Sequence, residues 1–245
     1  MKYLRVIRDG PLPGAANMAR DSELLAAHRA DSDPWLRLYR WSPPAVSLGY
    51  HQDPLAFDIS ALAARGYDLV QRPTGGRAIL HAEELTYAVV GTSPSSLFGS
   101  TLHDTYRAIN AALLAFLAVL GLQGEVSRGE SRSARRGLVC FHSAGQHEIK
   151  VGGRKLIGSA QRRIGRVFLQ HGSILTGPAH AELVDFQRAA AAHHSSRQQL
   201  LAATTDLGSL LKLEPDEPTY EGLGRQLVDA FAKTFGLPAE ERPPP

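Results

Sequence analysis

Three closely spaced β-strands are the feature that most constrains the fold of this chain. Residues 147–151 and 154–160 flank Gly152-Gly153, and a two-glycine turn between strand-like runs is typical of a β-hairpin. Residues 166–175 would form a third strand beside it. A sheet with such a hairpin is not the regularly alternating, all-parallel sheet of a doubly wound protein. We therefore expect an α+β fold with a mixed or antiparallel sheet flanked by helices.

Helical periodicity is clearest over residues 101–120 and 220–235. Apolar residues recur there at three- and four-residue steps, so each helix would bury one apolar side. Weaker patterns predict three further helices, and short strand-like runs predict three further strands. These helices are expected over residues 15–30, 54–66 and 181–192, and these strands over residues 35–41, 45–50 and 67–71.

Composition favours one domain inside the cell. A chain of 245 residues with 43% hydrophobic content can form a sizeable core. Its apolar runs fall short of the roughly 20 residues that span a bilayer. The first residues show no secretory signal, and a single cysteine fits a reducing compartment. We predict a cytoplasmic protein without membrane contact, with one domain over residues 1–238 and a disordered tail over residues 239–245.

Basic residues gather in two stretches of the chain. The net charge of +3 and the pI near 9.1 are modest. The stretches form either a solvated loop and strand edge or a landing surface that attracts an acidic partner. Nucleic acid is not expected, since aromatic residues are not interleaved with the basic ones. The first stretch contains Arg128, Arg132, Arg135 and Arg136, and the second contains Arg154, Lys155, Arg162, Arg163 and Arg166.

Cys140 is the only cysteine, so it cannot form a disulfide within the chain. Its apolar neighbours Val139 and Phe141 are typical of a buried cysteine that serves packing alone. The alternative is thiolate chemistry. A lysine ammonium group near the sulfur would lower the thiol pKa from about 8.5 and increase the reactive thiolate. Lys155, in the neighbouring hairpin, is the candidate.

A glycine loop, Thr74-Gly75-Gly76-Arg77, is the first candidate binding site. It lacks the further glycines of a P-loop or a dinucleotide-binding fingerprint, and ordinary tight turns also use such pairs. Arg72 precedes the loop and His81 follows it. Two guanidinium groups in one loop would suit a carboxylate or a phosphate on a ligand.

Small residues in two neighbouring segments are the second candidate. These segments are Gly158-Ser159-Ala160-Gln161 and His171-Gly172-Ser173. Small side chains at a strand end leave backbone N–H groups uncovered, as an oxyanion or an acyl carbonyl requires. The alternative is that they only let neighbouring strands pack tightly.

The ten histidines do not predict a metal site. His193 and His194 are adjacent, and the chain has neither a His-x3-His nor a Cys-x2-Cys pattern. A single cysteine also excludes a thiolate-rich site. We expect no metal.

Several of these segments together resemble the lipoate–protein ligase and octanoyltransferase superfamily. The signature loop of that superfamily is matched by this chain in two segments, residues 72–81 and Glu84-Leu85-Thr86-Tyr87. Five further segments resemble its cysteine-dependent, LipM-type octanoyltransferase branch. They are Cys140-Phe141, Glu148-Ile149 and residues 153–156, 158–161 and 169–175. Asn17-Met18-Ala19 also matches. The resemblance extends over about residues 5–175, with the segments in the right order and spacing.

The resemblance implies a biotin/lipoate protein ligase-like catalytic domain, whose α+β fold is like that of class II aminoacyl-tRNA synthetases. It implies that Cys140 attacks the thioester of octanoyl-acyl carrier protein. The octanoyl group would then pass to a lysine of a lipoyl domain, such as a glycine cleavage H protein or a dehydrogenase E2 subunit. Lys155 would stabilise the thiolate and carry the proton. No cofactor is expected, since a thioester reacts downhill to an amide without ATP, and we expect a monomer.

The resemblance also implies which residues bind the substrate. Residues 72–81 would wall the acyl pocket, and residues 158–160 would bracket the thioester carbonyl. The full predicted set is Arg72, Thr74, Gly75, Gly76, Arg77, His81, Gly158, Ser159, Ala160, Gln161, His171, Gly172 and Ser173.

Two other functions fit the same residues. In an ATP-dependent lipoate–protein ligase, Lys155 would hold an acyl-adenylate and Cys140 would be incidental. A non-catalytic protein of this fold would only bind a lipoyl domain or an acyl carrier. The chain departs from the family pattern at Gln71, at Ala82 and over residues 142–147, which affects partner choice and pocket shape more than the reaction.

Overall fold

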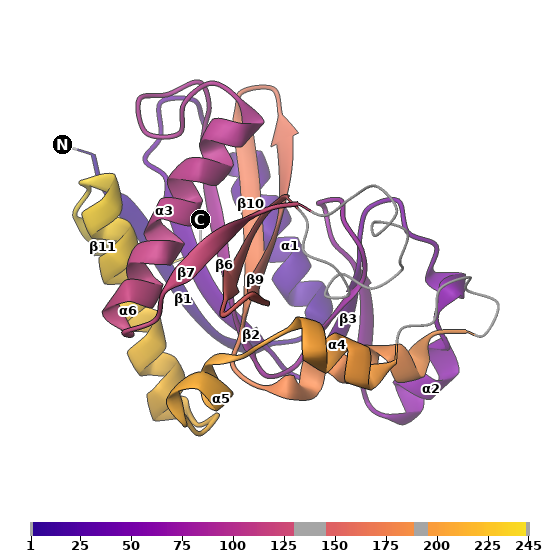
Figure 1. Cartoon of the computed structure of the whole chain (residues 1–245). Coiled ribbons are helices and arrows are strands. Elements are labelled where there is room, and N and C mark those ends of the chain that lie inside the picture. Colours follow the sequence, from indigo (N-terminus) through magenta and orange to yellow (C-terminus); the bar gives the residue numbers. More distant parts are fainter. Residues whose placement is uncertain (1, 130–145, 189–195, 244–245) are drawn as a thin grey trace.

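A mixed eight-stranded sheet forms the centre of the computed structural model, which describes residues 2–129, 146–188 and 196–243 (Figure 1). The first three strands in spatial order are parallel, and the other neighbouring pairs are antiparallel. The predicted α+β fold with a mixed sheet is confirmed. In spatial order the strands are β11 (Ala239–Glu241), β1 (Leu4–Leu12), β2 (Trp35–Trp41), β6 (Glu84–Thr92), β10 (Val167–Leu175), β9 (Arg154–Ile164), β8 (Gln146–Val151) and β7 (Gly124–Arg128).

The predicted hairpin is confirmed as strands β8 and β9. Gly152 and Gly153 form its turn with φ of +57° and +75°, a backbone conformation that favours glycine. Strand β10 then pairs antiparallel with β9 over the register from Val167–Ile164 to Ile174–Ile157. The three strands lie side by side, as their sequence predicts.

Helices cover both faces of this sheet (Figure 1). Helix α1 (Gly14–Ala27) lies on one face, and helices α3 (Leu102–Val119) and α6 (Glu217–Phe235) pack together on the other. Successive side chains of β6 point to opposite faces of the sheet and so enter two different hydrophobic cores. Val89 packs in the core on the α3/α6 side, and Val90 packs in the core on the α1 side. The result is a three-layer arrangement with the sheet in the middle.

Helix ends agree with local sequence signals. Thr101 caps α3 in a capping box with Asp104, and Asp216 caps α6. Gly236 ends α6 with a φ of +63°, as a left-handed terminal glycine does. Residues 101–120 and 220–235 are therefore helical where the periodicity predicts.

A second, three-stranded sheet stands beside the main one and carries the glycine loop. Strand β3 (Ala45–Leu48) lies between β4 (Asp68–Gln71) and β5 (Ile79–His81), and the loop joins β4 to β5. Short helices accompany these strands and the later part of the chain. They are η1 (Pro54–Ala56), α2 (Ile59–Ala64), η3 (Pro178–Phe186), α4 (Arg197–Ala203) and α5 (Leu207–Leu211).

Two predictions of local structure are wrong. Residues 181–192 do not form an α-helix where they are described, because η3 is a 3₁₀ helix and Gln187 is extended and pairs with Phe57. Nor is all of the segment 239–245 a disordered tail. Residues 239–241 form β11, whose Glu240 pairs with Arg5 of β1. In both segments residues pair with partners distant in sequence, Gln187 with Phe57 and Glu240 with Arg5.

Among the residues that the structure describes, no helix has both the length and the apolar character needed to cross a membrane.

Candidate functional site

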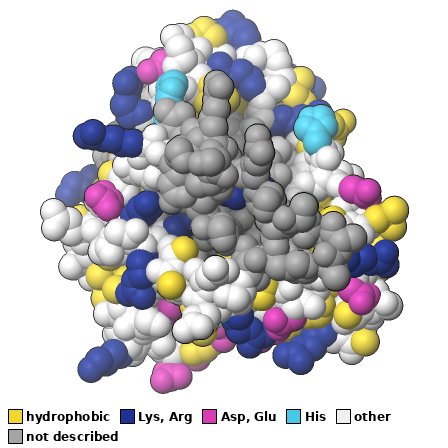
Figure 2. Space-filling model, turned by 45° about the vertical axis from the view of Figure 1, so that its right-hand side comes forward, with side chains coloured by type: hydrophobic (Ala, Val, Ile, Leu, Met, Phe, Trp, Pro, Cys, Tyr) yellow, Lys and Arg dark blue, Asp and Glu magenta, His cyan; other side chains and the backbone are white. Residues whose placement is uncertain are grey.

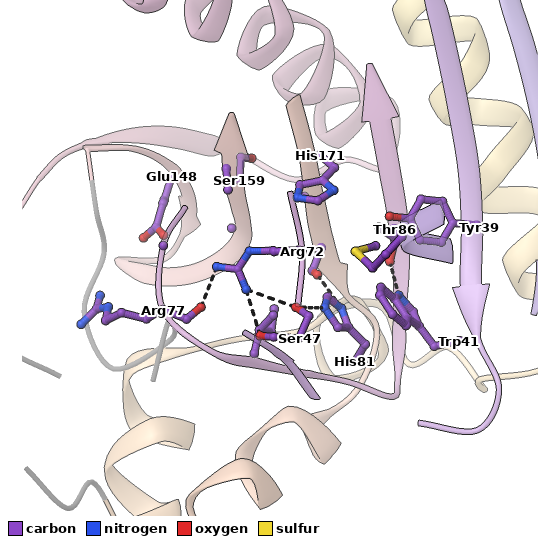
Figure 3. A pocket seen from close by; sticks show the side chains of 17 residues that line it. Tyr39, Trp41, Ser47, Arg72, Arg77, His81, Thr86, Glu148, Ser159 and His171 are labelled. Carbon is purple, nitrogen blue, oxygen red and sulfur yellow. Dashed lines mark hydrogen bonds between the residues drawn. The ribbon is translucent and has the colours of Figure 1, made fainter. Parts of the chain in front are cut away.

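A cavity of about 210 Å³ is walled by strands of both sheets, by the glycine loop and by Met18 of α1 (Figure 3). An apolar cavity of about 150 Å³ accommodates benzene, so this one has room for an acyl chain of medium length. Most of the predicted substrate-binding residues line it. These are Arg72, Gly76, Arg77, His81, Gly158, Ser159, Ala160, His171, Gly172 and Ser173.

The Arg72 guanidinium holds the glycine loop in place. It donates to the carbonyl oxygens of Ser47, Gly75 and Arg77 at 2.9, 2.9 and 2.8 Å (Figure 3). We expected Arg72 and Arg77 to bind an anion together. For Arg72 that expectation is corrected, because its donors are taken up by the protein's own main chain. Arg72 therefore shapes the cavity wall.

The backbone of the glycine loop lies directly against the backbone of Gly49, which follows β3. A Cβ atom at Gly49 would lie 1.9 Å from the carbonyl oxygen of Gly76, far inside van der Waals contact. Gly76 has a φ of +99°, where a side chain is strained. Both glycines are thus needed for the loop to close this side of the cavity.

His171 joins three elements around the cavity. Its Nδ1 lies 2.8 Å from Oδ2 of Asp21 in α1, and its Nε2 lies 2.7 Å from Oγ1 of Thr74 in the glycine loop. Burial lowers the pKa of His171 below its ordinary value, although Asp21 opposes the shift. A neutral imidazole donates from Nδ1 to the carboxylate, so Nε2 accepts from the Thr74 hydroxyl. Thr74 is a structural link to the cavity wall.

A fully buried ion pair lies behind His171. Arg37 of β2 donates from Nη1 to Oδ1 of Asp21 at 2.7 Å, and the hydroxyl of Tyr39 donates to Oδ2 at 2.8 Å. Burial would raise the pKa of Asp21, but the hydrogen bond from His171 and the charge of Arg37 lower it below its ordinary value. Asp21 is therefore ionised, and it fixes both Tyr39 and His171 at the cavity.

A second polar cluster surrounds His81. Its Nε2 lies 2.7 Å from Oγ of Ser47, its Nδ1 lies 2.8 Å from Oε1 of Glu84, and its ring stacks on Trp41 at 3.9 Å between centroids. Ser173 also donates to Oε1 of Glu84 at 2.9 Å. These bonds lock the His81 ring in one orientation at the cavity wall (Figure 3).

The small residues of β9 lie within the strand, where we expected a strand end. Gly158 and Ala160 pair with Ser173 and His171 of β10. On the other side of β9, pairing with β8 ends at Ile149–Ile157 among the described residues. One edge of residues 158–160 is thus used by the sheet. Tight packing is also a reason for the small residues, since a Cβ at Gly172 would lie 2.5 Å from the Gly158 carbonyl oxygen.

Lys155 is buried and forms an ion pair with Glu148 across the hairpin. Glu148 lines the cavity, and both side chains are less than one-tenth exposed. A buried pair of this kind is strongly destabilised when one partner is removed. The sequence prediction about Lys155 concerned a thiolate, and the structure adds a carboxylate beside it.

Four other predicted site residues either do not line the cavity or cannot be placed. Thr74 contacts His171, and the Gly75 carbonyl accepts from Arg72. The Gln161 side chain donates to Oε1 of Gln170 at 3.1 Å. Cys140 lies outside the described residues, so its predicted pairing with Lys155 stays a prediction.

Sequence reasoning assigned no site role to several residues that build the cavity. One signal was available, because Arg37, Tyr39 and Trp41 alternate along a strand and so share one face. An arginine on that face requires a buried anion, which Asp21 provides. The remaining residues come from unrelated segments and have no such signal. The residues without an assigned role are Met18, Asp21, Arg37, Tyr39, Trp41, Ser47, Glu84 and Glu148.

A basic landing surface, one of the two alternatives for these stretches, is reduced in the structure. Lys155 is buried, Arg162 donates to the Pro73 carbonyl oxygen at 2.9 Å, and Arg163 contacts Thr105. On the one face that Figure 2 draws, Lys and Arg side chains are distributed among acidic ones. Arg132, Arg135 and Arg136 lie outside the described residues. The second basic stretch is therefore not one continuous patch.

Within residues 2–129, 146–188 and 196–243, no group of three or more histidine, cysteine, aspartate or glutamate side chains is arranged to hold a metal ion.

In a comparison with known proteins, the family model of the lipoyl protein ligase A/B catalytic domain matches residues 13–232. Among curated relatives, octanoyltransferase LipM of Symbiobacterium thermophilum is 46% identical over 179 residues, which are 70% of this chain and 64% of that protein. Octanoyltransferase LipM of Kyrpidia tusciae is 41% identical, over 71% of this chain and 66% of that protein. Each match spans less than two thirds of the relative's length.

Solved structures share the fold. A bi-partite lipoate protein ligase from Thermoplasma acidophilum superposes with a TM-score of 0.78 at 18% identity, covering 99% of this chain and 87% of its own. Lipoate-protein ligase A bound with ATP gives a TM-score of 0.76 at 21% identity, covering 99% and 89%. At this identity the likeness concerns the arrangement of strands and helices.

Proposed function

This chain belongs to the lipoyl protein ligase A/B catalytic-domain family, and from that premise we propose that it is an octanoyltransferase. The donor is octanoyl-acyl carrier protein, and the acceptor is a lysine of a lipoyl domain. The acyl group passes through a thioester on Cys140. The similarity to two octanoyltransferases at more than 40% identity supports this activity.

The observation that carries the proposal is a cavity of acyl-chain size beside a buried lysine. The cavity of about 210 Å³ includes Met18, Trp41 and Ile79 among its apolar lining. Lys155 lies beyond Glu148, which forms part of the cavity wall. An ammonium group near the reacting sulfur favours the thiolate, which is the nucleophilic form of cysteine.

The reaction proceeds in two steps. The Cys140 thiolate attacks the thioester carbonyl, the carbon–sulfur bond to the carrier breaks, and the carrier thiolate takes up a proton. The acceptor amine then attacks the new thioester, and an amide forms as Cys140 leaves. The two easier steps together replace one slow direct transfer from the carrier to the lysine. Because a thioester is converted to an amide, the reaction needs neither ATP nor another cofactor.

The test is to incubate the protein with octanoyl-acyl carrier protein and measure its intact mass without ATP. We expect a mass increase of one octanoyl group, its loss on treatment with hydroxylamine, and no adduct on the Cys140→Ala variant. Absence of an adduct on the unaltered protein, or an equal adduct on the variant, overturns the proposal. Modification of a lipoyl domain only with ATP and free lipoate would identify a ligase instead. Lipoyl-domain binding without any transfer would identify a binding protein.

A further inference from the structure

A serine, a histidine and a glutamate form a continuous hydrogen-bonded series at the cavity wall. Oγ of Ser47 lies 2.7 Å from Nε2 of His81, and Nδ1 of the same ring lies 2.8 Å from Oε1 of Glu84. Ser47 and His81 line the cavity (Figure 3), and Glu84 is buried outside the lining. A hydroxyl that contacts an imidazole, which a third group orients in turn, is the arrangement of an activated nucleophile.

The glutamate sets the direction of these hydrogen bonds. An ionised carboxylate only accepts, so Nδ1 of His81 carries the proton and donates to Oε1 of Glu84. The same oxygen also accepts from Ser173 at 2.9 Å and from Thr86. In a neutral imidazole with its proton on Nδ1, the lone pair of Nε2 faces the Ser47 hydroxyl. This is the tautomer that a general base needs.

The sheet and an aromatic neighbour fix the two side chains relative to each other. Strands β3 and β5 pair antiparallel with Ala45 opposite His81, so Ser47, two residues further along β3, lies on the same face. The ring of Trp41 stacks on His81 at 3.9 Å between centroids, and its Nε1 donates to Oγ1 of Thr86 at 2.8 Å. The nucleophile and the base are therefore positioned before any ligand binds.

A cation lies beside the Ser47 hydroxyl. Nη1 of Arg72 is 3.2 Å from Oγ and 2.9 Å from the carbonyl oxygen of the same residue. The guanidinium charge stabilises the negative charge that develops when Oγ attacks a carbonyl group. Met18, Trp41 and Ile79 supply apolar lining, which suits an apolar acyl chain. The site therefore fits an ester of an apolar carboxylic acid.

We propose that Ser47, His81 and Glu84 form a second catalytic centre, which hydrolyses acyl esters without Cys140. Oγ attacks the carbonyl carbon while its hydrogen passes to Nε2 of His81. The bond to the leaving oxygen breaks, and that oxygen takes the proton from Nε2. Water then attacks the ester on Ser47, Nε2 takes one water proton and returns it to Oγ as the second carbon–oxygen bond breaks. The products are a carboxylic acid and an alcohol.

Glu84 has a positioning role in this sequence of steps. It keeps the Nδ1 proton of His81 in place and stabilises the imidazolium that forms in each step. The ester on Ser47 is expected to be hydrolysed faster than it forms, so it does not accumulate. This activity goes beyond the proposed transfer, because neither its nucleophile nor its base belongs to that reaction.

The test measures release of p-nitrophenol from p-nitrophenyl octanoate in the Cys140→Ala variant, in which the cysteine cannot be the nucleophile. We expect release above the rate in buffer. Addition of Ser47→Ala or His81→Gln should lower it at least about 100-fold, the scale of losing a nucleophile or a general base. Addition of Ser93→Ala should change it less than about twofold. Ser93 is a buried serine outside the lining, whose hydroxyl donates to the Gly99 carbonyl oxygen at 2.9 Å.

A covalent label gives a second measurement, which does not require the Ser47 and His81 variants to fold. A fluorophosphonate loses fluoride to an activated serine and forms a stable ester with its oxygen. Peptide mapping by mass after labelling of the Cys140→Ala variant should place this group on Ser47.

Three results overturn the inference. They are hydrolysis at the buffer rate, equal hydrolysis with and without Ser47→Ala, and a label that is absent or lies on another residue. None of these measurements uses the Cys140 thiol. The acyl adduct on Cys140, which tests the proposed function, can therefore fail or succeed independently of them.

Discussion

Nδ1 of His171 lies 2.8 Å from Oδ2 of Asp21, although 150 residues separate the two in the chain. This contact ties strand β10 to helix α1 across the α1-facing core. Through Nε2, the same ring reaches Thr74 of the glycine loop. Three segments that sequence alone does not connect therefore meet at one imidazole.

Asp21→Asn should destabilise the protein. The change removes one of the two carboxylates that pair with the fully buried Arg37 guanidinium and leaves only Asp9, which we expect to cost about 1–3 kcal/mol in the free energy of unfolding. Urea denaturation measures the difference. Asp31→Asn, at an exposed aspartate, should change stability by less than about 0.5 kcal/mol. Similar effects of both variants would show that the buried pair contributes little.

Gly49→Ala should disturb the cavity wall. Its methyl group would occupy the space of the Gly76 carbonyl oxygen, so the glycine loop must move. We expect a lower thermal midpoint and a slower first acylation step, measured by intact mass against time. Gly10→Ala adds a methyl group with no atom within 4 Å and is the control. An unchanged acylation rate in Gly49→Ala would show that the loop does not shape the acyl site.

His180→Gln should weaken the loss of stability in acid. Burial lowers the pKa of His180 to about 4, while the unfolded chain keeps about 6.5. Between these values the unfolded state binds more protons, so His180 contributes stability above pH 6.5 that is lost as pH falls toward 4. The slope is at most about 1.4 kcal/mol per pH unit. Unfolding free energies of both proteins from pH 7 to 4 should diverge by that slope, and parallel curves would contradict it.

Lys155→Ala should raise the pKa of the Cys140 thiol. Removal of the ammonium group takes away the charge that favours the thiolate and leaves Glu148 beside the site. Rates of iodoacetamide modification against pH measure the thiol pKa, and its midpoint should move to higher pH. Lys150→Ala, on the same hairpin, is the control. An unmoved midpoint in Lys155→Ala would remove Lys155 from the thiolate's surroundings.

Local sequence signals predict the helices and strands of this fold better than they predict which of these elements pair with one another. The glycine pair at 152–153 fixes the hairpin, and apolar periodicity fixes α3 and α6. The segment 239–241 was missed because a strand at the edge of a sheet depends on its neighbour, here β1, and not on its own composition.

For the candidate site too, the sequence indicated the contiguous motifs but not the partners of individual side chains. The glycine loop and the small residues of β9 and β10 are where the cavity lies, because their motifs are contiguous in sequence. Arg72 was given the wrong partner, since a guanidinium that binds carbonyl oxygens has the same local sequence as one that binds an anion. Asp21 and Glu148 gained their places only through contacts made in the folded chain.

The Arg72 bonds to three main-chain oxygens have a consequence for redesign. A boundary held by carbonyl groups keeps its contour when side chains along it other than those at Gly49 and Gly76 are exchanged, because every residue offers the same oxygen. Attempts to admit longer or bulkier acyl groups should therefore succeed at Trp41, Met18 or Ile79, whose side chains face the enclosed space. Changes within residues 75–77 should alter the rigidity of this boundary more than the size of the groups it accepts.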